Sequence, residues 1–274
     1  MAVTAQQEIS EGRRYGFGRN WGRFLAVLDE ERIRRAEESL RHMLELDDYR
    51  SRTFLDVGSG SGLFSLAARR MGAVVRSFDY DPDSVACTRE LKRRYFPGDA
   101  DWTIESGSVL DGAFMGALGV HDIVYSWGVL HHTGAMWQGI DAAARRVKTG
   151  GLLFIALYND QGIQSRIWRG IKRIYCSGLP GQALVCALLI PLLVVAGSLN
   201  DLRRLRNPLR RYMRPGFRGM SAFYNWFDWL GGYPFEVARP EAVIRYLRDR
   251  GFVLRNLATV GARLGNNQYV FMKS

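Results

Sequence analysis

A glycine-rich stretch near residue 60 constrains the fold of this chain more than any other part of its sequence. An apolar run of strand character, Thr53–Val57, leads into Gly58, Gly60 and Gly62, and the helix-forming run Leu63–Arg70 follows. A strand that feeds a glycine turn and then a helix brings bare backbone N–H groups and a helix N-terminus close to a bound ligand. Larger side chains would block that approach or disfavour the positive φ angles of the turn.

An acid at the end of the next predicted strand strengthens this interpretation. Seventeen residues after Gly62, a short apolar run containing Val74, Val75 and Phe78 ends in Asp79. In nucleotide-binding sheets an acid at this place holds the ribose hydroxyls. The glycines alone would be weak evidence. Together with the strand, the helix and this acid they predict a site for a nucleoside-bearing cofactor.

Strands alternate with helices over most of the chain. After an amphipathic helix at 29–46, strands are predicted at 53–57, 73–78, 102–105, 121–126 and 152–157, with helices at 63–71, 83–94 and 136–147 and a helix stop at 148–151. A later helix at 240–250 precedes strands at 252–257 and 267–272. Alternation at this spacing is typical of an α/β protein with a doubly wound parallel sheet.

The pattern divides the 274 residues into four segments. We expect an N-terminal helical segment or lid at 1–48, a cofactor-binding core at 49–160, a helical insertion at 161–237, and a C-terminal helix with the last two strands at 238–274. The aromatic run at 13–28, which contains Trp21, either packs on the core or closes over the site. The second aromatic run, 223–236, either fills the core of the insertion or lines a pocket.

The net charge of +11 is concentrated in the insertion. Between Asp160 and Met220, ten arginines and one lysine are set against two acids, which leaves only +2 for the rest of the chain. A polyanionic surface, such as membrane lipid or nucleic acid, or a phosphorylated substrate is the natural partner of such a region.

An uncharged apolar run, Ala183–Leu199, lies inside this basic region. The run has 17 residues and contains Pro191, whereas a bilayer-spanning helix takes about 20 apolar residues. A basic amphipathic helix is predicted before it at 163–176, and arginines crowd the stretch after it. Three interpretations stay open: a buried or lid-forming helical hairpin, an interfacial or re-entrant membrane contact, and a true span.

The cysteine content indicates the kind of compartment in which the protein works. Cys87, Cys176 and Cys186 show no paired spacing, so the sequence suggests neither a disulfide framework nor a metal site. This usage fits a reducing compartment. The polar N-terminus lacks the apolar core of a secretory signal. We therefore expect a cytoplasmic protein without a metal, in peripheral contact with the inner surface of a membrane if the apolar run binds lipid.

The glycine spacing narrows the cofactor. A dinucleotide-binding fingerprint places its third glycine five residues after the first, but here the interval is four and Asp56 stands two residues before Gly58. This pattern resembles the class I S-adenosylmethionine-dependent methyltransferases over roughly residues 50–160 and 238–273. The resemblance implies a seven-stranded Rossmann-like sheet with an antiparallel last hairpin and S-adenosylmethionine as cofactor. The Trp127–Thr133 segment looks like a loop of the small-molecule enzymes related to ubiquinone and menaquinone biosynthesis.

The resemblance also implies roles for individual residues. Asp56 and the glycine loop would hold the methionine part of the cofactor, Asp79 its ribose, and Tyr80 would lie beside the adenine. Where such enzymes often have an acid that contacts the adenine amine, this chain has Ser108, and Asp111 follows further along. The expected cofactor-binding residues are Asp56, Gly58, Gly60, Gly62, Asp79, Tyr80, Ser108 and Trp127.

Two adjacent histidines are the candidate catalytic bases. His131 and His132 follow the fourth strand, at the edge where open α/β sheets place their chemistry. Histidine suits removal of a proton from a hydroxyl acceptor near neutral pH, and we favour His131. Local packing or hydrogen bonding is the alternative for either residue. The candidates for contact with the acceptor are Trp21, Tyr158, Trp226, Trp229, Tyr233 and Glu236.

These features predict a methyltransferase that forms an O-methyl product on a small hydrophobic, glycan or lipid-linked acceptor, including a phosphorylated one. No Asn/Asp-Pro-Pro-Tyr segment follows the fourth strand, which disfavours methylation of nucleic-acid bases. Methylation of RNA or protein through the basic insertion and a non-catalytic cofactor-binding module remain alternatives. A nicotinamide oxidoreductase is disfavoured by the glycine spacing. The sequence leaves the acceptor and the oligomeric state open.

Overall fold

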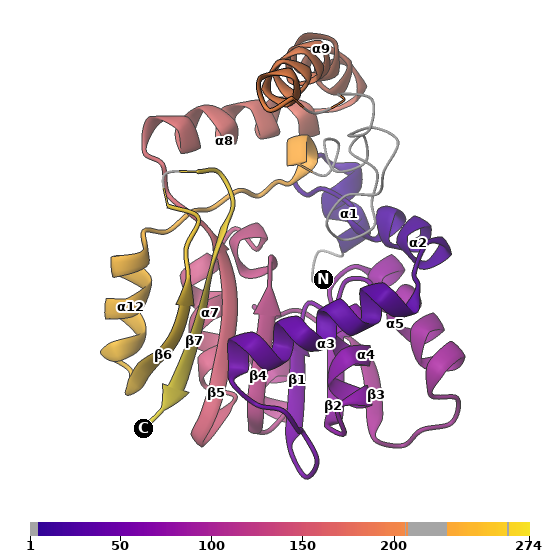
Figure 1. The fold of residues 1–274 in the computed structure, drawn as a ribbon, viewed down its shortest axis with the longest axis vertical. Helices are drawn as coiled ribbons and strands as arrows, with labels where there is room; N and C mark the ends of the chain where they lie inside the picture. The colour runs from indigo at the N-terminus through magenta and orange to yellow at the C-terminus, as the bar shows by residue number, and fades with distance from the viewer. Residues whose placement is uncertain (1–4, 206, 208–228, 262) are drawn as a thin grey trace.

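A seven-stranded sheet forms the centre of the protein in the computed structural model, which describes residues 5–205, 207, 229–261 and 263–274 (Figure 1). The strand order is β3-β2-β1-β4-β5-β7-β6. The first five strands are parallel, and β7 is antiparallel to both β5 and β6. The predicted doubly wound sheet with an antiparallel last hairpin is confirmed. The strands are β1 Thr53–Val57, β2 Val74–Asp79, β3 Trp102–Ser106, β4 His121–Trp127, β5 Val147–Tyr158, β6 Phe252–Ala258 and β7 Asn266–Lys273.

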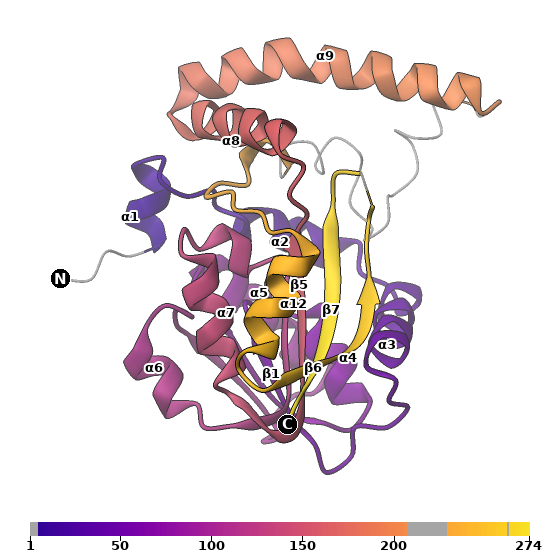
Figure 2. The same ribbon diagram turned by 90° about the vertical axis from the view of Figure 1, so that its left-hand side faces the viewer.

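Helices cover both faces of this sheet (Figure 2). Buried side chains of α3, α4 and α5 pack on one face, and those of α6, α7 and α12 pack on the other. Because both faces of the sheet are buried, its strands have near-continuous apolar sequences. The helices are α1 Ala5–Ser10, α2 Gly18–Ala26, α3 Glu30–Leu44, α4 Leu63–Arg70, α5 Pro82–Tyr95, α6 Gly112–Ala117, α7 Met136–Ala144, α8 Ile163–Cys176, α9 Leu179–Arg203 and α12 Pro240–Arg248, with one 3₁₀ turn, Leu130–His132.

Aspartate side chains cap the starts of α3 and α5. The Asp29 carboxylate accepts the backbone N–H of Arg32 at the start of α3, and the Asp81 carboxylate accepts that of Asp83 at the start of α5. Pro82 occupies the first turn of α5, where a missing N–H costs nothing because that group has no partner within the helix. The predicted start of this helix is confirmed.

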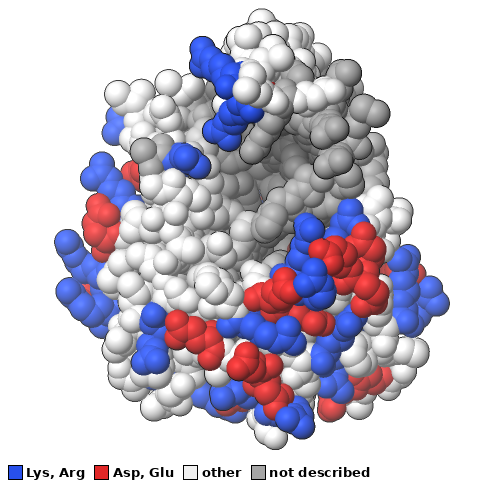
Figure 3. Space-filling model, in the orientation of Figure 1, with Lys and Arg blue, Asp and Glu red and all other residues white. Residues whose placement is uncertain are grey.

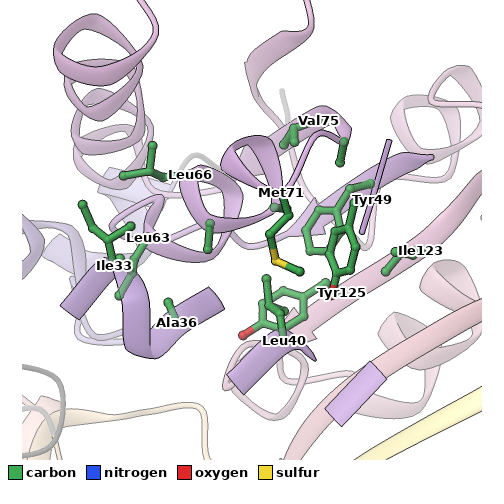
Figure 4. Close-up of a cluster of buried hydrophobic side chains, with 14 of the residues drawn as sticks. Ile33, Ala36, Leu40, Tyr49, Leu63, Leu66, Met71, Val75, Ile123 and Tyr125 are labelled. Carbon is green, nitrogen blue, oxygen red and sulfur yellow. The ribbon is translucent and has the colours of Figure 1, made fainter. Parts of the chain in front are cut away.

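The apolar stripe of α3 is buried against α4 and the sheet (Figure 4). Ile33, Ala36 and Leu40 recur at helical spacing, and all three are buried together with Leu66 of α4. Tyr125 of β4 belongs to the same cluster. Burial of a leucine side chain stabilises a fold by about 2 kcal/mol, so this stripe fixes α3 on the core.

The boundary between α7 and β5 differs from the sequence expectation. The helix ends at Ala144, and residues 148–151, predicted as a helix stop, lie inside β5. Val147 already pairs with His121 of β4, and the register then shifts before Ile123 pairs with Leu152. Gly150 takes a φ of +75° within this irregularity, so the glycines form a bulge in the strand. Helices α1, α2 and α6 were also not predicted from the sequence.

Helices α8 and α9 form a layer above the carboxyl edge of the parallel strands (Figures 1 and 2). The apolar run predicted at 183–199 belongs to the longer helix α9, which contains Pro191. Among the described residues, α9 is the one helix long and apolar enough to cross a membrane by length and composition. Residues 223–228 of the second aromatic run, which include Trp226, lie outside the described residues. The four-segment division of the chain stays a prediction.

Replacing Leu40 by alanine should destabilise the protein by about 3 kcal/mol, because the surrounding helices and strands cannot close the cavity that the substitution leaves. Leu40 is fully buried, whereas Glu38 in the same helix is exposed and forms an (i, i+4) ion pair with Arg34. Glu38→Ala should therefore cost under about 0.5 kcal/mol. Urea unfolding of the two variants measures the difference, and equal losses would contradict the packing described.

Candidate functional site

A cavity of about 480 Å³ opens at the carboxyl ends of the parallel strands. Its walls come from the N-terminal segment, the glycine loop after β1, the end of β2, the loops after β3 and β4, and the ends of β5 and β7. Eleven predicted site residues line it: Trp21, Asp56, Gly58, Gly60, Asp79, Tyr80, Ser108, Trp127, His132, Tyr158 and Trp229. Four others do not line it: Gly62, His131, Tyr233 and Glu236.

The glycine loop passes so close to its neighbours that side chains would not fit. Gly58 has a φ of +82°, and a Cβ there would lie 2.5 Å from the Val129 side chain. At Gly60 a Cβ would approach the Trp21 ring to 3.2 Å. Gly62 caps α4 in the left-handed conformation and packs against α5, so its role is to shape the turn. The loop leaves backbone exposed to the cavity, as a cradle for a ligand requires.

Asp56 presents an unpaired carboxylate oxygen inside this cradle. The residue is 1% exposed, and its Oδ2 accepts a hydrogen bond from the Ser65 hydroxyl at 2.5 Å. Its Oδ1 is buried without a hydrogen-bond partner. Burial raises the pKa of Asp56 to about 7, and the nearby Asp79 adds to the shift. A buried oxygen of this kind is costly unless a ligand donates to it, so the site suits an ammonium group.

The Asp79 carboxylate is tied to the glycine loop. Its Oδ2 accepts the Gly60 N–H at 2.8 Å, and its Oδ1 accepts the Asp81 N–H at 2.9 Å. Burial raises the pKa of Asp79 to about 6. The loop after β1 and the end of β2 therefore form one unit, which fixes the acid beside the cradle.

The N-terminal segment forms part of the cavity wall. Phe17 and Trp21 line the cavity, and the Gly18 N–H donates to the Asp81 carboxylate at 2.8 Å. The Arg14 guanidinium stacks over the Tyr80 ring at 5.1 Å and donates to the His132 carbonyl oxygen at 2.9 Å. Arg14 thus connects the cofactor end of the cavity to the histidine loop. Arg14 was not among the predicted site residues, because nothing in a charged N-terminus indicates its tertiary contacts.

The two histidines differ in tautomer and in access to the cavity. The Pro234 carbonyl lies 2.7 Å from His132 Nδ1, so this nitrogen carries the proton and Nε2 keeps its lone pair. In His131, Nδ1 accepts the Tyr158 N–H at 3.2 Å, which leaves the proton on a buried Nε2. His132 lines the cavity and His131 does not. Contrary to our preference from the sequence, this geometry favours His132 as the base.

Both histidines are neutral at physiological pH. Burial lowers the pKa of His132 to about 3 and that of His131 well below its usual value. The positive charge of Lys172 on α8 acts in the same direction on both. A neutral imidazole is the form that accepts a proton. Because its pKa is lowered, the His132 ring is entirely in the neutral form that can accept a proton. The same low pKa makes it a weak base.

Aromatic rings surround the histidine side of the cavity. The Trp127 indole donates to the Gln268 side chain at 3.1 Å, which orients its ring. The Tyr158 and Trp229 rings meet edge to face at a centroid distance of 5.5 Å. Asn266, at the start of β7, adds a buried Oδ1 without a hydrogen-bond partner. This wall offers apolar surface and one unpaired acceptor. Asn266 was not among the predicted site residues, since its strand is far from the others in the chain.

A buried lysine of α8 contacts the Trp229 side of this wall. Lys172 is fully buried, and its ammonium lies 4.3 Å from the Trp229 ring centroid and 5.0 Å from that of Phe235. It also donates to the Trp229 carbonyl oxygen. Cation–π contacts in a desolvated setting are worth about 2 kcal/mol or more. The contacts hold the Trp229 ring at the cavity.

Tyr233 and Glu236 have structural contacts away from the cavity wall. The Tyr233 carbonyl oxygen accepts the Tyr15 N–H at 2.9 Å. Glu236 Oε2 accepts the Met136 N–H at 3.0 Å and so caps the start of α7. Contact of either residue with an acceptor stays a prediction that this geometry does not favour.

The part of the chain that carries most of this site is similar to known proteins. Residues 55–155 fit the family model described as "Methyltransferase domain". The match assigns these residues of the chain to a methyltransferase domain. Over 113 residues it is 26% identical to a ubiquinone biosynthesis O-methyltransferase of Caulobacter vibrioides. That alignment covers 39% of this chain and 41% of the relative, so it spans less than half of the relative's length.

Two solved structures resemble the methyltransferase domain in fold. Magnesium protoporphyrin IX methyltransferase from Synechocystis PCC 6803, with S-adenosylhomocysteine bound, gives a TM-score of 0.51 at 13% identity, over 100% of this chain and 90% of that chain. An O-methyltransferase family protein from Burkholderia thailandensis gives 0.52 at 17% identity, over 88% of this chain and 57% of that chain. At these identities the likeness shows the fold alone.

The residues of this chain fit the cofactor S-adenosylmethionine. The unpaired Oδ1 of Asp56 can accept the ammonium of its methionine part, and the cradle at Gly58 and Gly60 leaves room for backbone contact. Asp79 is fixed where the ribose hydroxyls of a nucleoside would lie. Ser108 lines the cavity, while Asp111 is exposed and caps α6. In this methyltransferase domain, Ser108 is therefore the better placed of the two for the adenine.

The close approach at Gly58 predicts a measurable loss of cofactor affinity on substitution. Gly58→Ala should weaken binding of S-adenosylhomocysteine by tenfold or more, because the new Cβ must displace the loop or Val129. Gly98→Ala is the matched control, since Gly98 has a similar φ of +74° but no atom within 4 Å of the added Cβ. Calorimetric titration compares the two variants. Equal affinity in both would contradict a close-fitting cradle.

Proposed function

We propose that this protein transfers a methyl group from S-adenosylmethionine to a hydroxyl of a small hydrophobic acceptor. The observation that carries the proposal is His132, a neutral imidazole with a free Nε2 lone pair on the wall of the same cavity that contains the Asp56 and Asp79 cradle. A base and a cofactor site that share one cavity are what methyl transfer to a hydroxyl requires.

Each part of the cavity has a task in this reaction. Bound S-adenosylmethionine would supply an electrophilic methyl group on its sulfonium. In-line attack of an acceptor oxygen on that methyl carbon would break the carbon–sulfur bond and leave neutral S-adenosylhomocysteine. Asp56 and Asp79 hold the two ends of the donor, and the aromatic rings around Tyr158 exclude water and orient the acceptor. His132 takes the hydroxyl proton at Nε2, while its Nδ1–H stays on the Pro234 carbonyl.

The composition of the wall supports a flat or apolar acceptor. Trp127, Tyr158 and Trp229 provide ring surface, and the Asn266 Oδ1 accepts a hydrogen bond from a donor on the acceptor. A glycan or phosphorylated group is less well served by these residues. A lipid-linked acceptor, a cytoplasmic location and contact with a membrane remain finer parts of the proposal, and nothing in the cavity itself requires them.

Affinity for S-adenosylhomocysteine should fall as the pH drops below 7. Asp56 has a pKa of about 7 in the protein, and its ionised form pairs with the ligand ammonium, so each protonated Asp56 loses that pairing. The limiting slope for one proton is about tenfold per pH unit. Asp56→Asn should bind weakly at pH 8 and lose this step, keeping only a smaller one near pH 6 from Asp79. Calorimetry from pH 5 to 8 measures both profiles.

Asp47→Asn is the control for this titration, because Asp47 is exposed and does not line the cavity. It should keep the wild-type profile. A step near pH 7 that persists in Asp56→Asn would rule out Asp56 as the group that titrates.

Labelled methyl transfer tests the reaction itself. The protein is incubated with S-[methyl-³H]adenosylmethionine and the lipid, glycan and metabolite fractions of a host extract, and the labelled product is identified. His132→Gln should slow labelling by about a hundredfold, the usual contribution of a positioned base. His131→Gln should slow it less, because His131 does not line the cavity.

Both histidine variants should retain wild-type affinity for S-adenosylhomocysteine, which separates catalysis from cofactor binding. Wild-type labelling by His132→Gln would remove the base from the proposal. If the wild type labels no fraction yet binds S-adenosylhomocysteine, the alternative of a non-catalytic module is favoured.

A further inference from the structure

Helix α9 exposes a continuous aliphatic stripe. Six exposed residues are spaced by four, four, three, four and three positions, which keeps them on one side of an α-helix. Leu188 is 65% exposed and Leu192 61%, values that a core helix would not show. Monomeric soluble proteins rarely expose apolar surface of this extent without a partner. The stripe consists of Leu184, Leu188, Leu192, Val195, Leu199 and Leu202.

The opposite side of α9 is attached to the protein. Val185 is buried, and Leu189 packs with it against Tyr175 of α8. Asp201, near the end of α9, is also buried. A membrane-spanning helix would meet lipid on all sides, whereas α9 lies along α8 with one side covered (Figure 2). The helix is therefore suited to lie in the plane of an interface and not to cross it.

Cations outnumber acids along α8 and α9. Over residues 161–205 the sequence has five arginines and one lysine but a single acid, the buried Asp201. Figure 3 shows basic side chains without neighbouring acids at the top of the molecule, while acidic and basic side chains alternate over the lower half. Helix α8 adds three exposed isoleucines beside its arginines. The exposed arginines are Arg166, Arg169 and Arg173 on α8, and Arg203 and Arg204 at the end of α9.

We propose that the pair α8–α9 docks on an anionic lipid bilayer, with the aliphatic stripe of α9 at the acyl boundary and the arginines among the headgroups. An aliphatic face bordered by cations has the chemistry of an interfacial helix. The layer lies over the carboxyl edge of the sheet, where the cavity opens, and Lys172 of α8 connects it to Trp229 on the cavity wall (Figure 1). This surface stands independently of the methyl transfer proposed above.

Charge favours a bilayer over a second copy of the chain as the partner. Two copies that met through their stripes would bring ten exposed arginines together around one interface, and like charges at an interface are repulsive. Anionic headgroups instead neutralise these arginines. The same charges give the contact a salt dependence that a purely apolar contact would lack.

Vesicle sedimentation of the whole protein tests the proposal. Vesicles of phosphatidylcholine alone are compared with vesicles that also contain phosphatidylglycerol. The wild type should sediment with the anionic vesicles, less with the neutral ones, and less at high salt. Leu188→Asp/Leu192→Asp should reduce binding at least tenfold. Arg203→Gln/Arg204→Gln should reduce binding to the anionic vesicles by about thirtyfold, the effect of two charges near a charged surface.

The matched controls carry the same changes elsewhere on the exposed surface. Val120→Asp/Val253→Asp introduces two acids at exposed valines outside α8 and α9, and Arg245→Gln/Arg255→Gln removes two exposed arginines outside these helices. Both should bind vesicles like the wild type. Titration with S-adenosylhomocysteine checks that every variant is folded, and it also tests the cofactor site separately from the docking surface.

Three results would overturn the proposal: no sedimentation of the wild type with either vesicle, equal sedimentation of the stripe and control variants, or a light-scattering mass of a dimer that only Leu188→Asp/Leu192→Asp converts to a monomer without any vesicle binding. The last result would assign the stripe to a second copy of the chain. Failure of labelled methyl transfer with intact sedimentation would instead count against the proposed reaction alone.

Discussion

The candidate site depends on the hydrogen bonds that join the loop after β1 to the end of β2. The N–H groups of Gly58 and Ser59 donate to the Phe78 carbonyl oxygen, and that of Gly60 donates to the Asp79 carboxylate. These bonds set the height of the glycine loop above the sheet and aim the acid at the same ligand. Because α4 starts just after Gly62, the same bonds hold the loop, the acid and a helix N-terminus beside one another.

The acceptor side of the cavity is built differently. No single motif forms it. Arg14 links the N-terminal segment to the carbonyl of His132, and the buried Lys172 links α8 to Trp229. A buried cation on aromatic faces is stable only while those rings stay in place, so α8 and the Trp229 part of the wall depend on each other. The same contacts place an exposed apolar helix over the edge of the sheet that carries the cavity.

Much of the fold and the donor half of the site could be predicted from the sequence. The Thr53–Val57 strand, the glycines and Asp79 lie within about 30 residues, and local pattern decides their conformation. The first residues of β5 were wrongly predicted as the end of a helix, because Val147 becomes extended only through its pairing with His121. The sequence also could not show which of His131 and His132 is better placed as the base. The tautomer of His132 is set by the Pro234 carbonyl, and that of His131 by the Tyr158 N–H, both distant in the chain.

The sequence by itself determined a doubly wound sheet and a cofactor cradle, because glycine spacing and strand-ending acids act over a few residues. The tertiary structure alone decided which histidine reaches the cavity, that Arg14 and Asn266 belong to its lining, and that α9 is covered on one side and exposed on the other. These features arise where segments far apart in the chain meet. Contacts between such segments produce no local pattern in the sequence from which they could be predicted.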